Sequence, residues 1–360
     1  MQKLKFRRRY AMSFQEAKRE SIKRYMLEKI RLDDVEFIQK TTYNFQISAT
    51  TVKRYLHECL ENQIILEDNS SECGYRLQKQ EHCFEYSTKD DLDEDSIYFE
   101  DISPLLHDVS EEAQHIWCYA FMEMMNNAIE HSGCENVCCR VVKDVLYTEI
   151  TITDDGIGVF KNVQNYLTAE LGKKATYQDA LVELYKGKLT TAPENHSGEG
   201  IFFSSKVVDE FAIWSDNAIY VQGVQERTRF VQNHLIAYYT RLNHIGTAVM
   251  MKLDNKTKRQ LGEVFDMYAP PEEGFVKTRI PIKDVCQEGE PMARSQARKI
   301  LWRLEQFTKV EFDFEEVDFM GQGFADEVFR VFKARHPEVE IIPVNACPRV
   351  LGMIKHVQRA

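Results

Sequence analysis

Residues 123–131 read Glu-Met-Met-Asn-Asn-Ala-Ile-Glu-His, a run that mixes polar and apolar side chains at helical spacing. Side chains four residues apart share one face of a helix, so Glu123, Asn127 and His131 are expected along one edge while the methionines turn toward a core. A carboxylate can take a proton from water or a hydroxyl, and an asparagine carbonyl is a neutral ligand for Mg²⁺. The run therefore predicts the wall of a binding pocket, although an ordinary amphipathic helix has the same spacing.

Two glycine-containing stretches follow. Residues 145–154 alternate as a strand whose inward face carries Thr148, Ile150, Ile152 and Asp154. The carboxylate of Asp154 can accept a hydrogen bond from an adenine amino group. Gly156 and Gly158 then allow a sharp turn close to a ligand, although Asp-Asp-Gly is also a common turn sequence. Residues 196–203, His-Ser-Gly-Glu-Gly-Ile-Phe-Phe, read as a glycine-rich loop that opens a helix, whose free N–H groups favour phosphate.

In this order, the three stretches resemble the ATP-binding fold shared by gyrase, Hsp90, histidine kinases and MutL (the GHKL fold), over residues 95–256. The resemblance implies that Glu123 is a general base, that Asn127 is the Mg²⁺ ligand and that Asp154 contacts adenine. It places six further residues around the nucleotide: His131, Gly156, Gly158, Gly198, Gly200 and Thr247. The motif Asn-Ala-x-x-His-Ser is most similar to the corresponding motif of the anti-sigma-factor kinases.

The segment between Gly158 and Gly198 falls where the GHKL family has its ATP lid. A helix is expected over residues 177–185. After it come Lys186, Lys188, Thr190 and Thr191, which can reach phosphates or can belong to a solvated loop.

The composition is that of a soluble globular protein, with 43% hydrophobic and 29% charged residues in a chain of 360. No apolar run approaches the length of a membrane span and the N-terminus lacks an apolar signal core, so we expect a cytoplasmic protein without a membrane partner. The nine cysteines are scattered without a Cys-x-x-Cys pair, which favours reduced thiols over disulfides or a zinc site.

The N-terminal part is basic. Residues 1–80 contain 16 Lys and Arg against 11 Asp and Glu, a net charge of +5, while the whole chain carries −11. Helices are expected over 13–30 and 33–38 and from Ser48 onward, followed by strands at 64–67 and 75–77. The third helix is expected to turn Val52, Tyr55 and Leu56 inward. This order resembles a winged helix-turn-helix, in which the third helix would present Thr50, Thr51, Lys53 and Arg54 to DNA. Lys3, Lys5, Arg7, Arg8 and Arg9 would add phosphate contacts, but winged helices also dock proteins.

Beyond residue 255, strands and helices alternate, which predicts a small βαβ-type sheet. Arg294-Ser-Gln-Ala297 and the stretch from Asp318 to Phe329 resemble a STAS-like domain, the family of the anti-sigma-factor antagonists. Those antagonists carry a phosphorylatable Ser at one turn, whereas residues 320–323 here read Met-Gly-Gln-Gly, so we expect a docking or dimerisation module instead.

We therefore predict a multidomain α+β protein with a winged helix, a GHKL α/β sandwich and a small STAS-like α/β domain. The expected boundaries are a winged helix at residues 1–80, an acidic linker and entry to the ATP domain at 81–110, the ATP domain at 111–256 and the STAS-like domain at 270–360. The expected function is a regulator in which Mg-ATP binding, with or without hydrolysis, controls DNA or partner binding. An anti-sigma-type serine/threonine protein kinase and a dimerising GHKL ATPase clamp remain alternatives.

Overall fold

The structure is a computed structural model that describes residues 14–90, 92–172, 174–188, 198–215, 218–223, 246–286 and 289–359. Two compact units divide the chain. Unit 1 comprises Met1–His82 with Val142–Thr148, and unit 2 comprises Cys83–Val141 with Glu149–Ala360. Among the described residues, no helix combines the length and the apolar character that a membrane span requires.

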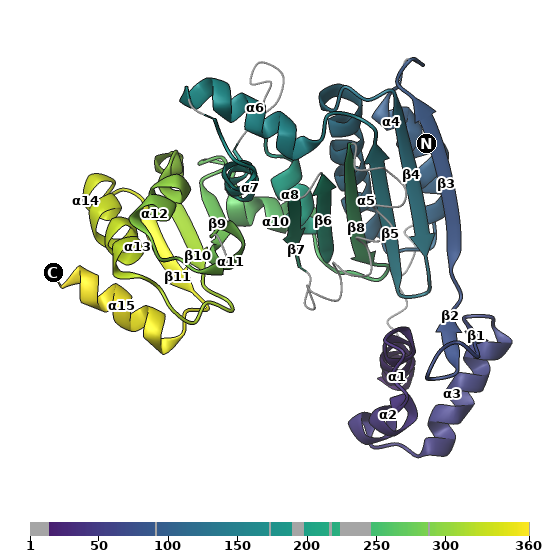
Figure 1. Ribbon diagram of the computed structural model, residues 1–360. Coiled ribbons are helices and arrows are strands. Elements are labelled where there is room, and N and C mark those ends of the chain that lie inside the picture. Colours follow the sequence, from purple (N-terminus) through teal and green to yellow (C-terminus); the bar gives the residue numbers. More distant parts are fainter. Residues whose placement is uncertain are drawn as a thin grey trace, which may run out of the picture. The chain divides into compact units, whose positions relative to one another are not determined.

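Unit 1 consists of three helices and a two-stranded hairpin around one core (Figure 1). Ser48 precedes the third helix, and its Oγ accepts a hydrogen bond from the backbone N–H of Thr51, as expected of an N-cap. Val52, Tyr55 and Leu56 are buried, as predicted. The elements are α1 (Phe14–Arg31), α2 (Phe37–Phe45), α3 (Ala49–Glu61), β1 (Ile65–Glu67) and β2 (Tyr75–Leu77).

The second helix differs from the prediction, because it begins at Phe37 and not at Asp33. Asp33 has a positive φ of 56°, which a continuing helix does not allow. Its carboxylate instead accepts hydrogen bonds from the Ser71 hydroxyl and from the backbone N–H groups of Glu72 and Cys73. These bonds hold the pKa of Asp33 well below its usual range and tie the helical corner to the hairpin turn.

Unit 2 contains a six-stranded sheet with the strand order β3-β4-β5-β8-β6-β7 (Figure 1). Helix α5 contributes a row of buried side chains, among them Ile116, Trp117 and Met124, to the large core of this unit. The strands are β3 (Gln80–Ser87), β4 (Asn136–Lys143), β5 (Tyr147–Asp154), β6 (Glu210–Ser215), β7 (Ala218–Gln222) and β8 (Thr247–Asp254). The helices are α4 (Glu94–Ile97), α5 (Glu111–Asn126), α6 (Val159–Leu171), α7 (Tyr177–Lys186), α8 (Gly200–Val207) and α10 (Leu261–Tyr268).

The acidic segment expected as a linker is an integral part of unit 2. Strand β3 forms one edge of the sheet, and the helical turns from α4 to Leu106 bury Ile97, Tyr98 and Ile102. Asp95 and Glu100 are exposed, while these three apolar side chains enter the core. The segment therefore closes one side of the domain and is not a spacer.

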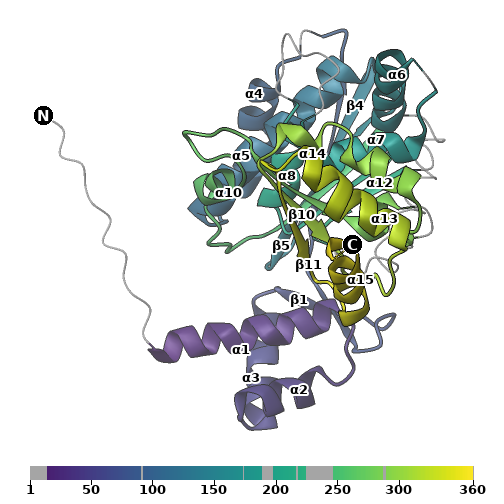
Figure 2. The same ribbon diagram turned by 90° about the vertical axis from the view of Figure 1, so that its left-hand side faces the viewer.

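The C-terminal region is a three-stranded parallel sheet with the order β11-β10-β9. Its helices α12, α13 and α15 pack against one another beside the strands (Figure 2). The elements are β9 (Lys277–Pro281), α11 (Ile282–Val285), α12 (Arg294–Leu301), β10 (Lys309–Asp313), α13 (Gln322–Asp326), which continues through Glu327–Phe332 into α14 (Lys333–Arg335), β11 (Glu340–Val344) and α15 (Pro348–Gln358). This is the alternation predicted from the sequence, and it is consistent with a STAS-like region.

Candidate functional site

A cavity of about 350 Å³ lies in unit 2 between the C-terminal part of α5, the ends of β5 and β8, and helices α6, α7 and α8. Its lining includes Glu123, Asn127, His131, Asp154, Gly158, Gly198, Gly200 and Thr247. Among the residues predicted to surround the nucleotide, Gly156 alone does not line the cavity. Three sequence stretches thus meet at one place.

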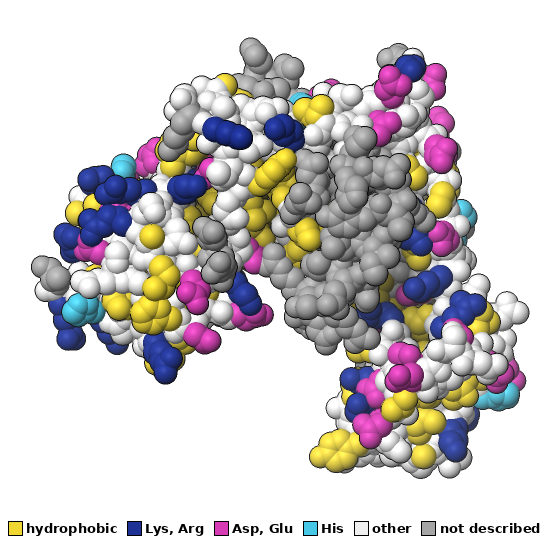
Figure 3. Space-filling view, viewed as in Figure 1, with side chains coloured by type: hydrophobic (Ala, Val, Ile, Leu, Met, Phe, Trp, Pro, Cys, Tyr) yellow, Lys and Arg dark blue, Asp and Glu magenta, His cyan; other side chains and the backbone are white. Residues whose placement is uncertain are grey.

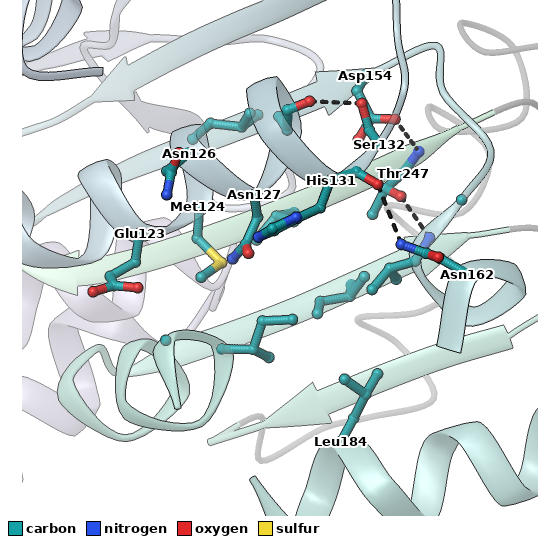
Figure 4. A pocket seen from close by; sticks show the side chains of 18 of the residues that line it. Glu123, Met124, Asn126, Asn127, His131, Ser132, Asp154, Asn162, Leu184 and Thr247 are labelled. Carbon is teal, nitrogen blue, oxygen red and sulfur yellow. Dashed lines mark hydrogen bonds between the residues drawn. The ribbon is translucent and has the colours of Figure 1, made fainter. Parts of the chain in front are cut away.

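The polar edge of α5 continues through a π-helical turn over Asn127–His131. Such wide turns are frequent at functional sites. Figure 4 shows Glu123 at one end of the cavity, Asp154 and Thr247 at the other, and Asn127 and His131 between them. The four-residue spacing read from the sequence therefore spreads the polar groups along the length of the cavity.

Asp154 ends β5 and is only 5% exposed. Its Oδ1 accepts hydrogen bonds from the backbone N–H of Gly156 at 2.9 Å and from that of Thr247 at 3.3 Å. Burial raises the pKa of Asp154 to about 6, and the two N–H donors oppose this shift only in part. A carboxylate held in this way is a directed hydrogen-bond acceptor at the closed end of the cavity.

The glycines around Asp154 are required by close packing. A Cβ on Gly156 would overlap the carbonyl oxygen of Ser132, and one on Gly158 would overlap Oγ of Ser215. Gly158 also has a φ of +84°, which favours glycine. Gly156 thus supports the site by its backbone although it does not line the cavity.

The apolar wall of the cavity and three of its polar members, Asn126, Ser132 and Asn162, were not predicted from the sequence. Asn162 on α6 lines the cavity and donates a hydrogen bond from Nδ2 to the carbonyl oxygen of His131 at 3.2 Å. Strand alternation already placed Ile152 on the same face as Asp154 and was the one available signal for this wall. The missed lining residues are Met124, Asn126, Ala128, Ser132, Ile152, Val159, Asn162, Val163, Leu184, Ile201, Ile213 and Val249.

The two lysines expected to reach phosphates are engaged elsewhere. Lys186 is buried, and its ammonium group contacts Glu183 and the carbonyl oxygen of Trp302. Lys188 donates a hydrogen bond to the carbonyl oxygen of Gln306 at 2.8 Å. Thr190 and Thr191, which were also expected to reach phosphates, lie outside the described residues.

The residues predicted to face DNA lie in unit 1. Thr50, Lys53 and Arg54 are exposed on α3, and Thr51 is half-buried with its hydroxyl 3.0 Å from that of Ser48. The basic residues Lys3, Lys5, Arg7, Arg8 and Arg9 lie outside the described part of the chain. The exposed face of α3 therefore offers two cations and one hydroxyl to a partner.

Basic side chains also gather over the helices of the C-terminal region (Figure 3). Three of them are already paired with acidic residues of the same region. Arg294 and Arg330 contact Asp326, and Arg298 contacts Glu327. The two carboxylates therefore compensate part of the charge of the three arginines.

Comparison with known families identifies the C-terminal region only. Residues 296–350 match a family model described as a STAS-like domain of unknown function (DUF4325). The match confirms the STAS-like prediction for these residues. No curated protein matches the chain.

Proposed function

We propose that the cavity in unit 2 binds Mg-ATP, and that the protein is a regulator in which the bound nucleotide controls how the flanking domains bind DNA or a partner. The proposal rests on the resemblance of unit 2 to GHKL ATP-binding domains. The observation that carries it is the convergence of three separate sequence stretches and Thr247 on one cavity. If α5 were an ordinary amphipathic helix with its polar face in water, the other two stretches and Thr247 would not be expected beside that face.

The end of the cavity at Asp154 suits an adenine base. A buried carboxylate can accept a hydrogen bond from the amino group, and Ile152, Ile213 and Val249 supply apolar surface for the ring. A volume of about 350 Å³ lies in the range of small-molecule sites.

The end of the cavity at Glu123 suits phosphates. Gly198 and Gly200 lead into α8, whose first N–H groups have no side-chain cap. Mg²⁺ takes few ligands from the protein when phosphates and water supply the others, so Asn127 fits as its single protein ligand. Bound Mg²⁺ would offset phosphate charge, and Glu123 would take the proton of the water that attacks the terminal phosphate, giving ADP and phosphate.

The DNA-binding part of the proposal rests on unit 1. Its three helices and hairpin have the order of a winged helix-turn-helix, and α3 presents Thr50, Lys53 and Arg54 on its exposed face. Phosphate contacts by the two cations would make the binding sensitive to salt.

A test is to incubate the full chain with Mg²⁺ and ATP labelled on the γ-phosphate, and to follow the label among ATP, free phosphate and protein. We expect label in free phosphate with the wild-type chain and none with Glu123→Ala, which should still bind the nucleotide. Asp154→Ala should bind none.

Label on the protein would identify a kinase instead of a hydrolase. Label that stays in bound ATP would identify a nucleotide-held regulator without turnover. The absence of any bound nucleotide, or binding that survives in Asp154→Ala, would contradict the assignment of the site.

A further inference from the structure

Helix α7 both lines the candidate nucleotide cavity and contacts the C-terminal region. Leu184 lines the candidate nucleotide cavity, while other residues of the same helix contact the C-terminal region. Figure 1 shows α7 between the six-stranded sheet and the strands of the C-terminal region. One short helix is thus shared by the candidate site and the region that contains the STAS-like domain.

The C-terminal end of α7 is fixed by a buried lysine. The side chain of Lys186 is 2% exposed and reaches Glu183 on its own helix and the carbonyl oxygen of Trp302, which follows α12. Its ammonium group also lies 5.6 Å from the centre of the Trp302 ring. A buried ammonium group needs these partners, so this contact depends on the C-terminal region being in place.

Three further contacts join α7 to the C-terminal region. Asp179 forms an ion pair with Lys299 of α12 at 2.9 Å, and Gln178 donates a hydrogen bond to the carbonyl oxygen of Asp284 at 3.0 Å. The hydroxyl of Tyr185 donates to the carboxylate of Asp284 at 2.9 Å. The helix is therefore held by the C-terminal region along its length.

We infer that the C-terminal region acts as a positioning element for the nucleotide cavity: by docking on α7 it sets the wall that Leu184 forms, so that docking and nucleotide binding stabilise each other. This inference rests on the proposed function, because it requires that the cavity bind Mg-ATP. The coupling is reciprocal by thermodynamic necessity, so nucleotide must strengthen docking by the same factor by which docking strengthens nucleotide binding.

The direction of the coupling follows from the contacts. In the docked arrangement, the cavity wall that Leu184 forms is already ordered before the nucleotide binds. Nucleotide binding therefore does not lose free energy to ordering this wall. Release of α7 would remove that ordering, and Mg-ATP would then bind more weakly.

The experiment uses the full chain and two docking variants. Lys299→Glu replaces the ion pair with Asp179 by a repulsion, and Tyr185→Phe removes the hydroxyl that bonds both Asp284 and the carbonyl oxygen of Val221 on β7. The matched control is Lys355→Glu, the same charge change at an exposed position of α15. The dissociation constant for Mg-ATP is measured by calorimetry, and amide hydrogen exchange of residues 177–186 is followed with and without Mg-ATP.

We expect Lys299→Glu to weaken Mg-ATP binding by roughly five-fold or more, a typical coupling between sites, and Tyr185→Phe to weaken it less. Both variants should exchange faster over α7, and Mg-ATP should slow exchange in α7 and α12 of the wild-type chain. Lys355→Glu should behave as the wild type.

Failure of this inference is separable from failure of the proposed function. A wild-type chain that binds no Mg-ATP overturns both. A wild-type chain that binds Mg-ATP, together with docking variants that bind it equally well or more tightly despite faster exchange in α7, overturns the positioning role alone. Unchanged exchange in both variants would show that these contacts do not hold α7, which also overturns it.

Discussion

The backbone of Gly200, the first residue of α8, lies so close to Glu123 that a Cβ at this position would overlap the Oε2 atom of the carboxylate. The glycine thus leaves room for the side chain that we propose as the general base. Because the overlapping atom is the end of a flexible side chain, a methyl group here would displace the carboxylate and leave the fold in place.

Gly200→Ala is therefore expected to reduce ATP turnover by at least about 100-fold, the usual contribution of a general base, without unfolding the protein. Phosphate release and the melting temperature measure the two effects. Gly262→Ala is the matched control, since a Cβ at Gly262 on α10 meets no neighbouring atom. Full turnover in Gly200→Ala would show that the position of Glu123 does not matter.

The raised pKa of Asp154 predicts that nucleotide binding depends on pH. Below about pH 6 the carboxyl becomes protonated, and one of its acceptor oxygens turns into a donor that an adenine amino group cannot use. We expect the affinity for Mg-ATP to fall as the pH drops through 6. Calorimetry between pH 5 and 8 on the wild type and Asp154→Asn separates this effect from protonation of the nucleotide, which both proteins share. A constant ratio of the two affinities would contradict the role of Asp154.

The same shift predicts that Asp154→Asn stabilises the nucleotide-free protein. The folded-state pKa of about 6 lies above the ordinary value of 3.8, so the contribution of this carboxyl to folding is complete below about pH 4 and is lost as the pH rises through 6. At pH 7 the wild type buries a charge that the variant lacks. We expect a gain of about 1–3 kcal/mol at pH 7 and none at pH 4.

Tryptophan fluorescence during urea unfolding measures this stability, because all three tryptophans (Trp117, Trp214 and Trp302) lie in unit 2. An Asp154→Asn variant less stable than the wild type at pH 7 would mean that the carboxylate is better solvated than its burial indicates.

The sequence was sufficient where local periodicity determines which way a side chain faces. The two-residue period of β5 buries Thr148, Ile150, Ile152 and Asp154, as predicted. The Ser48 cap and the apolar face of α3 likewise depend only on residues within one turn of the helix.

Strand β3 gave no such signal. It is an edge strand whose first four residues, Gln80–Cys83, are exposed, and Phe84 and Tyr86 near its end are only partly buried against the core, so the apolar–polar alternation covers too few residues to indicate a strand. The apolar residues after it, Ile97, Tyr98 and Ile102, follow a dense run of acidic residues that dominates the local composition. A linker was therefore expected where the sheet has its edge.

The orientation of α7 could not be predicted because it is decided by distant residues. Lys186 reads as a solvated or phosphate-binding lysine from its neighbours alone. Besides Glu183 on its own helix, its ammonium group bonds the carbonyl oxygen of Trp302, which is 116 positions away in the sequence. Tertiary contacts of this kind leave no trace in the local pattern.

The buried pair of Glu183 and Lys186 predicts strong coupling between two substitutions. Burial raises the pKa of Glu183 and lowers that of Lys186, so each group depends on the other to remain charged. Lys186→Met alone should destabilise unit 2 by about 3–5 kcal/mol, because it leaves a buried carboxylate without its cation. The double variant Glu183→Leu/Lys186→Met should recover most of that loss in a double-mutant cycle followed by urea unfolding. Additive single effects would contradict the coupling.

The exposed cations of α3 supply the last prediction, which concerns DNA. Lys53 and Arg54 lie on the exposed face of the helix, and the guanidinium of Arg54 lies 5.2 Å from the centre of the Tyr55 ring. Contacts from both residues to phosphates would each release about one counterion, so Lys53→Ala/Arg54→Ala should weaken binding to duplex DNA and reduce the slope of log affinity against log salt by up to about 2. Fluorescence anisotropy across a salt series measures both quantities, with Lys355→Ala/Arg359→Ala on the C-terminal region as the control pair. An unchanged affinity and slope would contradict DNA binding through α3, because a DNA-reading helix cannot lose two exposed cations without losing part of its salt dependence.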